Sequence, residues 1–227
     1  MQPIIRRLFV SCWILILTAA TASAHKPISI GGVFPTYDQA LMMSEIDVSQ
    51  VVYSPLSEAN AQLWLVLQAE ADTQLDVSLG VPVLERLTGY RPNLAVLAPG
   101  LPAIDLPFML PANVGGIVLA SADTQVPRAF HEPFTGTNSW ILIEDSIELP
   151  VAGLAYIVAW APNDQADKLW VAIGQREQFG PADFVSFPAI IREVRAFHEA
   201  GPQDRGVLAA LLFGGFTAAW LALLFAR

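Results

Sequence analysis

Long apolar stretches lie at both ends of the chain, and short apolar runs fill the part between them. Residues 8–20 carry no charge behind Arg6 and Arg7, and residues 206–226 carry none before Arg227. The runs in between are rich in valine, isoleucine and aromatic residues, and they are bounded by proline, glycine, asparagine and aspartate, which is typical of strands. The pattern predicts an exported, β-rich protein with a membrane-spanning tail.

The strand pattern recurs at intervals of roughly ten residues. It covers residues 45–53, 62–68, 75–79, 94–97, 116–120, 140–143, 155–160 and 169–173. Short strands at this spacing predict a mainly β fold, an antiparallel β-sandwich over residues 45–178. Residues 25–44 are expected to precede it as an N-terminal extension, and Pro99–Pro111 is expected to be an extended loop.

The first 24 residues have the order of a secretory signal peptide: two arginines, an apolar region, and Ala22-Ser23-Ala24 as a cleavage site. Cleavage there would make His25 the new N-terminus. The chain's one cysteine, Cys12, lies inside this segment. The mature chain therefore has no disulfide, and its stability must come from packing.

Residues 206–226 are long enough to cross a hydrocarbon core of roughly 30 Å as a helix at about 1.5 Å per residue. The predicted protein is single-pass in the cytoplasmic (inner) membrane, with its domain on the periplasmic or extracellular side and its C-terminus in the cytoplasm. Small residues recur every fourth position and form a helix-packing face suited to self-association or to a membrane-protein partner. They are Gly206, Ala210, Gly214, Ala218 and Ala222.

Residues 181–200 have apolar positions near a helical period, with charged residues on the other face. They predict an amphipathic juxtamembrane helix, although Pro188 could divide it into two. Such a helix could pack on the sandwich or lie on the membrane surface.

The chain is acidic, with a formal net charge of −9. Loss of Arg6 and Arg7 with the signal peptide makes the mature chain more acidic still. Nucleic acid is therefore excluded as a partner, whereas cations and basic protein surfaces suit this charge.

The usual catalytic motifs are absent from the sequence: it has no Gly-x-Ser-x-Gly elbow, no His-Glu-x-x-His helix, no phosphate loop and no dinucleotide fingerprint. The chain is therefore expected not to be an enzyme. The tail and the sandwich together favour a non-enzymatic binding or accessory module of a membrane-associated complex.

A copper-binding protein is the first alternative. A processed N-terminal His25 offers an amine and an imidazole nitrogen to one ion, and His131 could supply a second imidazole, a donor set that suits copper(II). The competing interpretation is that cleavage after Ala24 happens to expose a histidine. No other cofactor is expected.

Residues 131–137 form the most distinctive polar run, flanked by Phe130 and Phe134. Side chains in this run could bind a ligand or partner, since polar loops on a rigid scaffold carry many binding sites. They could instead bond to the backbone and shape a turn. The side chains concerned are His131, Glu132, Thr135 and Thr137.

Two further residue sets allow more than one interpretation. Glu144, Asp145 and Glu148 could supply oxygen ligands to calcium or form a solvated acidic face. The strand tryptophans could belong to the core or form a platform for carbohydrate or another surface ligand. They are Trp64, Trp140, Trp160 and Trp170.

Several segments resemble a family of exported prokaryotic β-sandwich proteins that are anchored to the membrane at the C-terminus. These segments are Ser49–Tyr53, Ala98–Pro102, Leu106–Phe108, His131–Thr137 and Leu149–Gly153. The second half of the chain is also similar, more loosely, to bacterial pre-peptidase C-terminal domains, in which a Leu-Pro-x-x-Gly turn leads into a strand. The resemblance implies a jelly-roll-like fold and supplies no catalytic residues.

Overall fold

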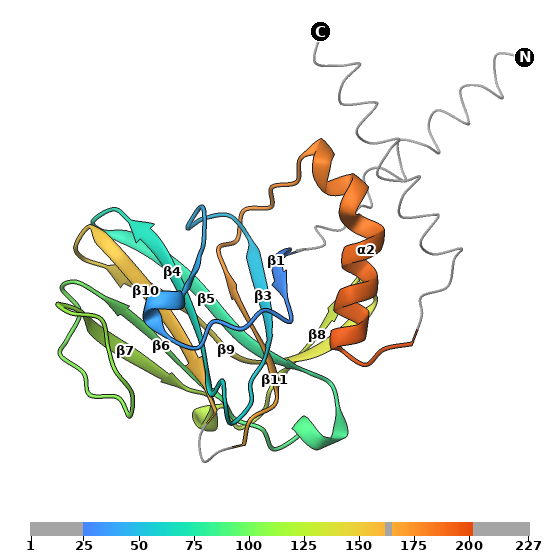
Figure 1. Ribbon diagram of the computed structural model, residues 1–227, viewed down its shortest axis with the longest axis horizontal. Helices are drawn as coiled ribbons and strands as arrows, with labels where there is room; N and C mark the ends of the chain where they lie inside the picture. Colours follow the sequence, from blue (N-terminus) through green and yellow to red (C-terminus); the bar gives the residue numbers. More distant parts are fainter. Residues whose placement is uncertain (1–24, 162–164, 202–227) are drawn as a thin grey trace, which may run out of the picture.

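Two β-sheets packed face to face make up most of the computed structural model, which describes residues 25–161 and 165–201 (Figure 1). The six-stranded sheet has the order β1 (Lys26–Ile30), β3 (Gln50–Pro55), β11 (Lys168–Ile173), β5 (Thr73–Pro82), β9 (Thr137–Leu149) and β8 (Arg128–Glu132). The five-stranded sheet has the order β2 (Leu41–Met42), β4 (Gln62–Ala69), β10 (Gly153–Trp160), β6 (Asn93–Ala98) and β7 (Gly115–Ala120). Short 3-10 turns, η1 (Tyr37–Gln39), η2 (Glu85–Leu87) and η3 (Ser121–Asp123), and one helix, α2 (Pro181–Phe197), complete the described elements.

Both sheets are mixed, so the prediction of a wholly antiparallel sandwich was wrong. Strand β1 pairs in parallel with β3, and β2 pairs in parallel with β4. Parallel pairing needs a crossover. Here the chain leaves β1, adds β2 to the opposite sheet, and returns to β3. Residues 25–44, expected as an extension outside the sandwich, thus supply an edge strand to each sheet.

The core between the sheets follows the alternation predicted for the strands. Inward side chains of both layers are fully buried, which is the arrangement that a strand period of two produces. Among them are Leu65, Leu67, Leu75, Leu79, Leu94, Val96, Leu142, Ile157 and Val171.

The proline-rich loop covers the outer face of the five-stranded sheet, and none of Pro99–Pro111 forms a strand or helix. Phe108 from this loop packs edge-on between Trp64 and Trp160, with ring centroids at 5.6 and 5.3 Å. Trp64 has no exposed surface, and Trp170 in the other sheet is 3% exposed. Trp64 and Trp170 are therefore core residues that present no open face to a sugar, whereas Trp140 and Trp160 are partly buried against the core.

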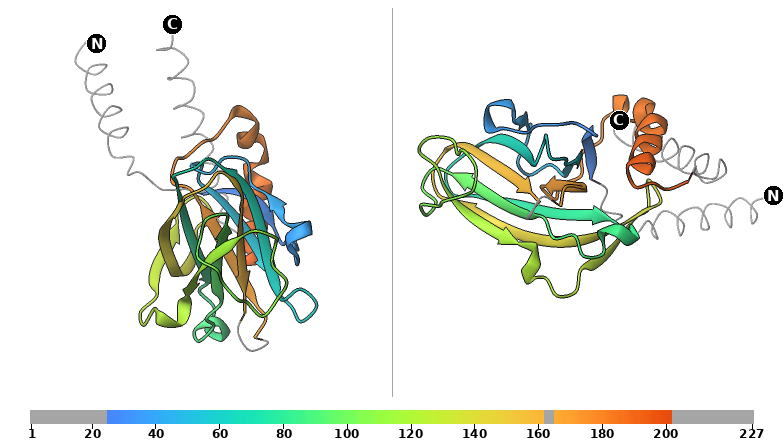
Figure 2. Two further views of the ribbon diagram at one scale, coloured as in Figure 1. Left: turned by 90° about the vertical axis from the view of Figure 1, so that its left-hand side faces the viewer. Right: turned by 60° about the horizontal axis from the view of Figure 1, so that its bottom comes forward.

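Helix α2 packs against part of the outer face of the six-stranded sheet (Figure 2). It continues through Pro188 as one helix, and it buries Val194 and Phe197 against Tyr53 and Trp170. Of the two alternatives for the amphipathic segment, the structure shows packing on the sandwich for residues 181–197.

Within residues 25–161 and 165–201, no helix is long and apolar enough to cross a membrane. The predicted signal peptide, the predicted tail helix over residues 206–226 and its packing face of small residues lie outside the described part of the chain.

Candidate ligand-binding cleft

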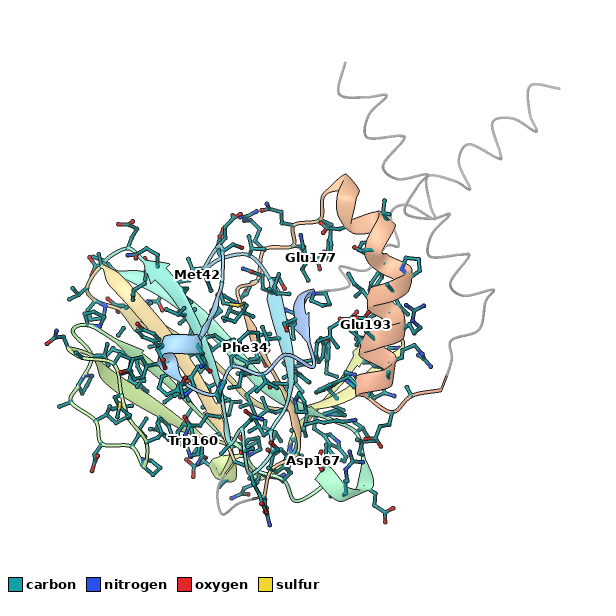
Figure 3. All side chains as sticks on the ribbon, viewed as in Figure 1. Phe34, Met42, Trp160, Asp167, Glu177 and Glu193 are labelled. Carbon is teal, nitrogen blue, oxygen red and sulfur yellow. The ribbon has the colours of Figure 1, made fainter. Side chains whose placement is uncertain are left out.

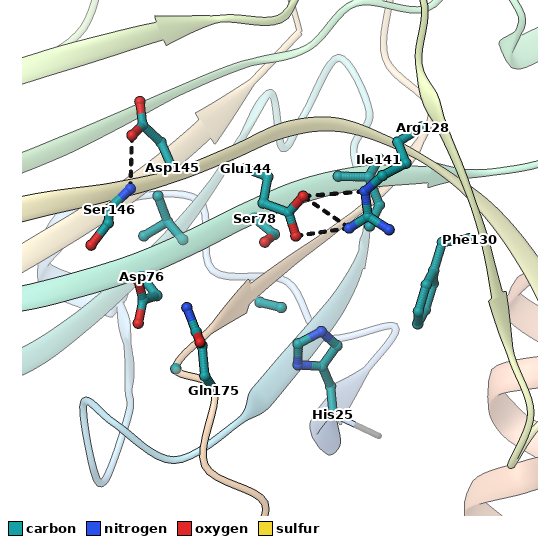
Figure 4. A pocket seen from close by; sticks show the side chains of 13 residues that line it. His25, Asp76, Ser78, Arg128, Phe130, Ile141, Glu144, Asp145, Ser146 and Gln175 are labelled. Carbon is teal, nitrogen blue, oxygen red and sulfur yellow. Dashed lines mark hydrogen bonds and ion pairs between the residues drawn. The ribbon is translucent and has the colours of Figure 1, made fainter. Parts of the chain in front are cut away.

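A cleft of about 560 Å³ lies on the outer face of the six-stranded sheet, beside the region that α2 covers (Figure 4). Its walls come from the start of β1, from β5, β8 and β9, and from the end of β11. The lining residues are His25, Asp76, Val77, Ser78, Arg128, Phe130, Ile141, Glu144, Asp145, Ser146, Ala172, Gly174 and Gln175. A volume of this size suits a small ligand or a few side chains of a partner.

Strand pairing determines which side chains reach the cleft. On β5, Asp76 and Ser78 alternate with buried residues such as Val77, so they point away from the core. Their partners on β9 are Ser146 and Glu144, and directly paired residues share a face of the sheet. A polar floor is therefore built on two rigid, adjacent strands.

One wall of the cleft contains an ion pair. Arg128 on β8 donates from Nη2 to both carboxylate oxygens of Glu144, at 2.7 and 2.9 Å. Both side chains are more than half exposed, so this pair contributes little to stability. The pair does neutralise Arg128, which is the one arginine or lysine among the lining residues. Phe130 lies two residues further along β8, on the same face.

Three polar side chains in the cleft have no partner among the described residues. The Asp76 carboxylate, the Ser78 hydroxyl and the Gln175 amide make no hydrogen bond or ion pair from their side chains, although the backbones of Asp76 and Gln175 are paired. Figure 4 shows them around the opening, together with His25. These groups are free to bind a ligand.

His25 stands at the edge of the cleft. Its Nδ1 lies 2.6 Å from Ser49 Oγ, and its ring is 6.5 Å from that of Trp170, centroid to centroid. Burial lowers the pKa of His25, against the opposing effect of the Glu144 and Glu177 charges. The imidazole is therefore neutral at pH 7, the form that accepts hydrogen bonds and binds metals.

Glu132 is a buried carboxyl group on the same face of β8. Its pKa is raised to about 7, chiefly by burial and also by the charge of Glu177, while the backbone N–H of Phe134 and the charge of His131 oppose the shift. That N–H donates to Glu132 Oε1 at 3.1 Å. Glu177 lies at the end of the sheet opposite to Asp167 (Figure 3).

The structure does not bring His131 to His25. On β8, Arg128 and Phe130 face the cleft, and His131 is one residue beyond Phe130. Adjacent strand residues point to opposite faces, so His131 projects from the other side of the sheet, where its Nδ1 lies 2.8 Å from Asn138 Oδ1. The two imidazoles predicted to share a copper ion are on opposite faces.

Residues 132–137 form a tight, internally bonded turn. Glu132, Thr135 and Thr137 are buried, and the two threonine hydroxyls lie 2.7 Å apart. Arg195 of α2 donates to the carbonyl oxygens of Thr135 and Gly136, at 2.8 and 3.1 Å. The run predicted as a ligand loop or a turn thus fastens the β8–β9 hairpin to the helix.

Ser139 Oγ and His198 Nε2 lie 3.1 Å apart and form a buried hydrogen bond between β9 and the end of α2. His198 Nδ1 lies 2.8 Å from Val194 O and can only donate there, so Nε2 accepts from Ser139 Oγ. Ser139 in turn accepts from Trp170 Nε1 at 3.1 Å. The polar side-chain atoms of His198, Ser139 and Trp170 thus all have hydrogen-bond partners, and Ser139 and His198 are buried.

Among the described residues, no group of three or more His, Cys, Asp or Glu side chains is placed to hold a metal ion. Two of the three acidic residues considered for calcium have partners within the protein: Glu144 pairs with Arg128, and Asp145 Oδ1 accepts from the backbone N–H of Ser146 at 2.8 Å. The third, Glu148, is exposed and lies outside the cleft.

No protein-family model matches the sequence, and no curated protein matches it. Among solved structures, the chain is similar to the pre-peptidase C-terminal domain of a collagenase from Bacillus anthracis, with 9% identity and a TM-score of 0.32 over 59% of this chain and 93% of that one. It is also similar to CorA, a surface-associated copper-binding protein important in copper acquisition by Methylomicrobium album BG8, with 9% identity and a TM-score of 0.34 over 65% of this chain and all of that one. Structural similarity as low as this gives no information about the ligand or activity of the present protein.

Sequence reasoning missed Asp76, Ser78 and Gln175. A polar residue at every second position of a strand indicates only a solvent-facing side, and most such residues bind water. Their shared lack of partners appears only once β5, β9 and β11 are placed side by side.

Proposed function

We propose that this protein is a non-enzymatic binding module, displayed outside the cytoplasm on a membrane tail, and that the outer-face cleft is its binding site. The observation that carries the proposal is the set of unpartnered polar side chains, Asp76, Ser78 and Gln175, around a cavity of about 560 Å³. Elsewhere on the same face, the polar side chains of Ser139 on β9 and of Arg195 on α2 are bonded within the protein.

The rigidity of the cleft supports a binding role. Its floor belongs to β5 and β9, which both have a neighbouring strand on each side. One wall is continuous with the packing of α2 on Trp170 and Ala172. A preformed site loses little conformational entropy when a ligand binds.

The end of α2 is also held to the sandwich. Arg86 bonds to both Asp167 and Glu199, and Lys168 donates to Glu199 Oε1 at 2.7 Å. These contacts fix the last turn that precedes residues 202–227. A tail anchored in a membrane would then hold the cleft in a defined orientation, as an accessory subunit of a membrane complex requires.

Copper is a second candidate ligand, because the cleft contains a neutral imidazole next to carboxylates. Cleavage after Ala24 would add the α-amine of His25. Chelation by that amine and Nδ1 would break the present contact of Nδ1 with Ser49. His131 takes no part in this form of the site.

A thermal-shift screen tests the proposal on the full-length protein in detergent. The panel contains amino acid amides, amines, mono- and disaccharides, Ca²⁺ and Cu²⁺, each tested with wild type and with Ser78→Trp, which fills the cleft. A ligand at a hundred times its Kd stabilises by about 2.7 kcal/mol, which raises Tm by roughly 5–10 °C. We expect this rise in wild type and its loss in Ser78→Trp.

A second variant, Gln175→Ala, keeps the test valid if the tryptophan disturbs folding. A Cu²⁺ shift that disappears in His25→Ala would support the metal alternative. A panel without any shift, or shifts equal in wild type and in both cleft variants, would contradict a binding role for the cleft.

A further inference from the structure

We propose that the cleft recognises a guanidinium group, and that its ligand is an arginine side chain of a partner polypeptide. This inference rests on the proposed binding function and specifies the ligand. It follows from the hydrogen-bonding character of the free groups, from the charge of the cleft and from the shape of its lining.

The free groups of the cleft are able to accept hydrogen bonds. Asp76 offers two carboxylate oxygens, Ser78 a hydroxyl oxygen, and Gln175 an amide oxygen. An ionised carboxylate cannot donate, so a ligand there must bring donors. A guanidinium brings five N–H donors in a planar fork and accepts none, which matches such a set.

The charges of the cleft point the same way. Arg128 is its one cationic lining residue, and the bidentate contact with Glu144 already neutralises it. Asp76 then leaves an excess of negative charge, and the whole chain carries −9. An anionic ligand would find no free cation, whereas a basic segment would be attracted over a distance.

The apolar part of the lining suits the stem of an arginine. Phe130, Ile141 and Ala172, whose side chains lie on the outer face of the sheet, are found among the polar groups. The three methylenes of arginine can pack on such a surface while its head stays at the carboxylate. Neutral saccharides fit less well, because no tryptophan that could stack on a sugar lines the cleft.

Peptide binding to the full-length protein in detergent tests this inference. The probes are acetylated and amidated Ala-Ala-Arg-Ala-Ala and the same peptide with citrulline, which has nearly the same shape without the charge. We expect the arginine peptide to bind about tenfold tighter or more, as is usual for a charge-assisted contact. Asp76→Asn should remove that preference and leave the citrulline affinity unchanged.

Glu148→Gln is the matched control. Glu148 is exposed on β9 and lies outside the cleft, so its loss removes the same charge from the same sheet. Its effect on the arginine peptide should stay within about twofold, through long-range charge alone.

Equal affinities for the two peptides, or equal effects of Asp76→Asn and Glu148→Gln, would overturn the guanidinium inference. If a neutral ligand then stabilised wild type but not Ser78→Trp, the cleft would remain a binding site with another ligand class. If no ligand distinguished wild type from the cleft variants, the proposed function would fail as well.

Discussion

Replacing Glu132 by glutamine is expected to stabilise the protein at pH 8 by about 3 kcal/mol and to leave its stability unchanged at pH 4. The carboxyl group is buried, and burial raises its pKa from 4.5 to about 7. Between these values the folded state binds more protons than the unfolded state, so the stability of wild type falls as pH rises through this window. At about 1.4 kcal/mol per pH unit, the shift corresponds to roughly 3 kcal/mol.

Chemical denaturation of wild type and Glu132→Gln at pH 4, 6 and 8 measures this difference. Glutamine keeps an oxygen for the backbone N–H of Phe134, so the turn should persist. The lowered pKa values of His25 and His198 destabilise both proteins alike as pH falls below 6.5, and they cancel in the comparison. If the difference in unfolding free energy between the two proteins did not change with pH, the pKa of Glu132 would not be raised in the folded state.

Gly80→Ala is expected to destabilise the protein by about 3 kcal/mol, the upper end for an overpacked core. A Cβ at this position on β5 would lie 2.2 Å from Cζ2 of Trp170 and 2.7 Å from the carbonyl oxygen of Trp140. Trp170 cannot easily move, because α2 packs on it and its indole N–H donates to Ser139.

Gly89→Ala is the control, since a Cβ there meets no atom within 4 Å. Its effect on the free energy of unfolding should be within about 0.5 kcal/mol, as is usual for surface changes, so its Tm should be close to that of wild type. Gly80→Ala should also loosen the cleft, because the ring of Trp170 lies beside His25. Equal Tm values for the two variants would contradict the close packing of α2 on this sheet.

The strands of the sandwich were predictable where both faces are buried. Runs such as residues 62–68, 94–97 and 169–173 correspond to β4, β6 and β11, because their apolar residues pack on both sides. The edge strands β1, β2 and β8 were not predicted. Each buries few side chains, and Pro27 in β1 is tolerated only because an edge strand can lack a ladder donor.

Parallel pairing at the sheet edges could not be predicted either. It depends on the path of residues 25–44 across the sandwich, and local periodicity does not encode that path. The position of α2 was predictable in outline, since its apolar positions recur with a helical period.

The candidate site was predictable only in part. His25 was singled out for its position after the cleavage site, and Glu144 and Asp145 were singled out for their charge; all three line the cleft. His25 and His131 do not lie together. The sequence pattern predicts a loop at residues 131–137, whereas His131 belongs to strand β8, and strand alternation places it on the other face of the sheet.

The three histidines make a direct test of where a ligand binds. His25 edges the cleft, His131 projects from the opposite face of the sheet, and His198 is buried beneath α2. Imidazole resonances of the full-length protein would be recorded by NMR while the arginine pentapeptide is added to saturation. We predict that the His25 resonance shifts and that those of His131 and His198 do not. A peptide that binds while the His25 resonance stays unchanged would place the site elsewhere and contradict the assignment of the cleft.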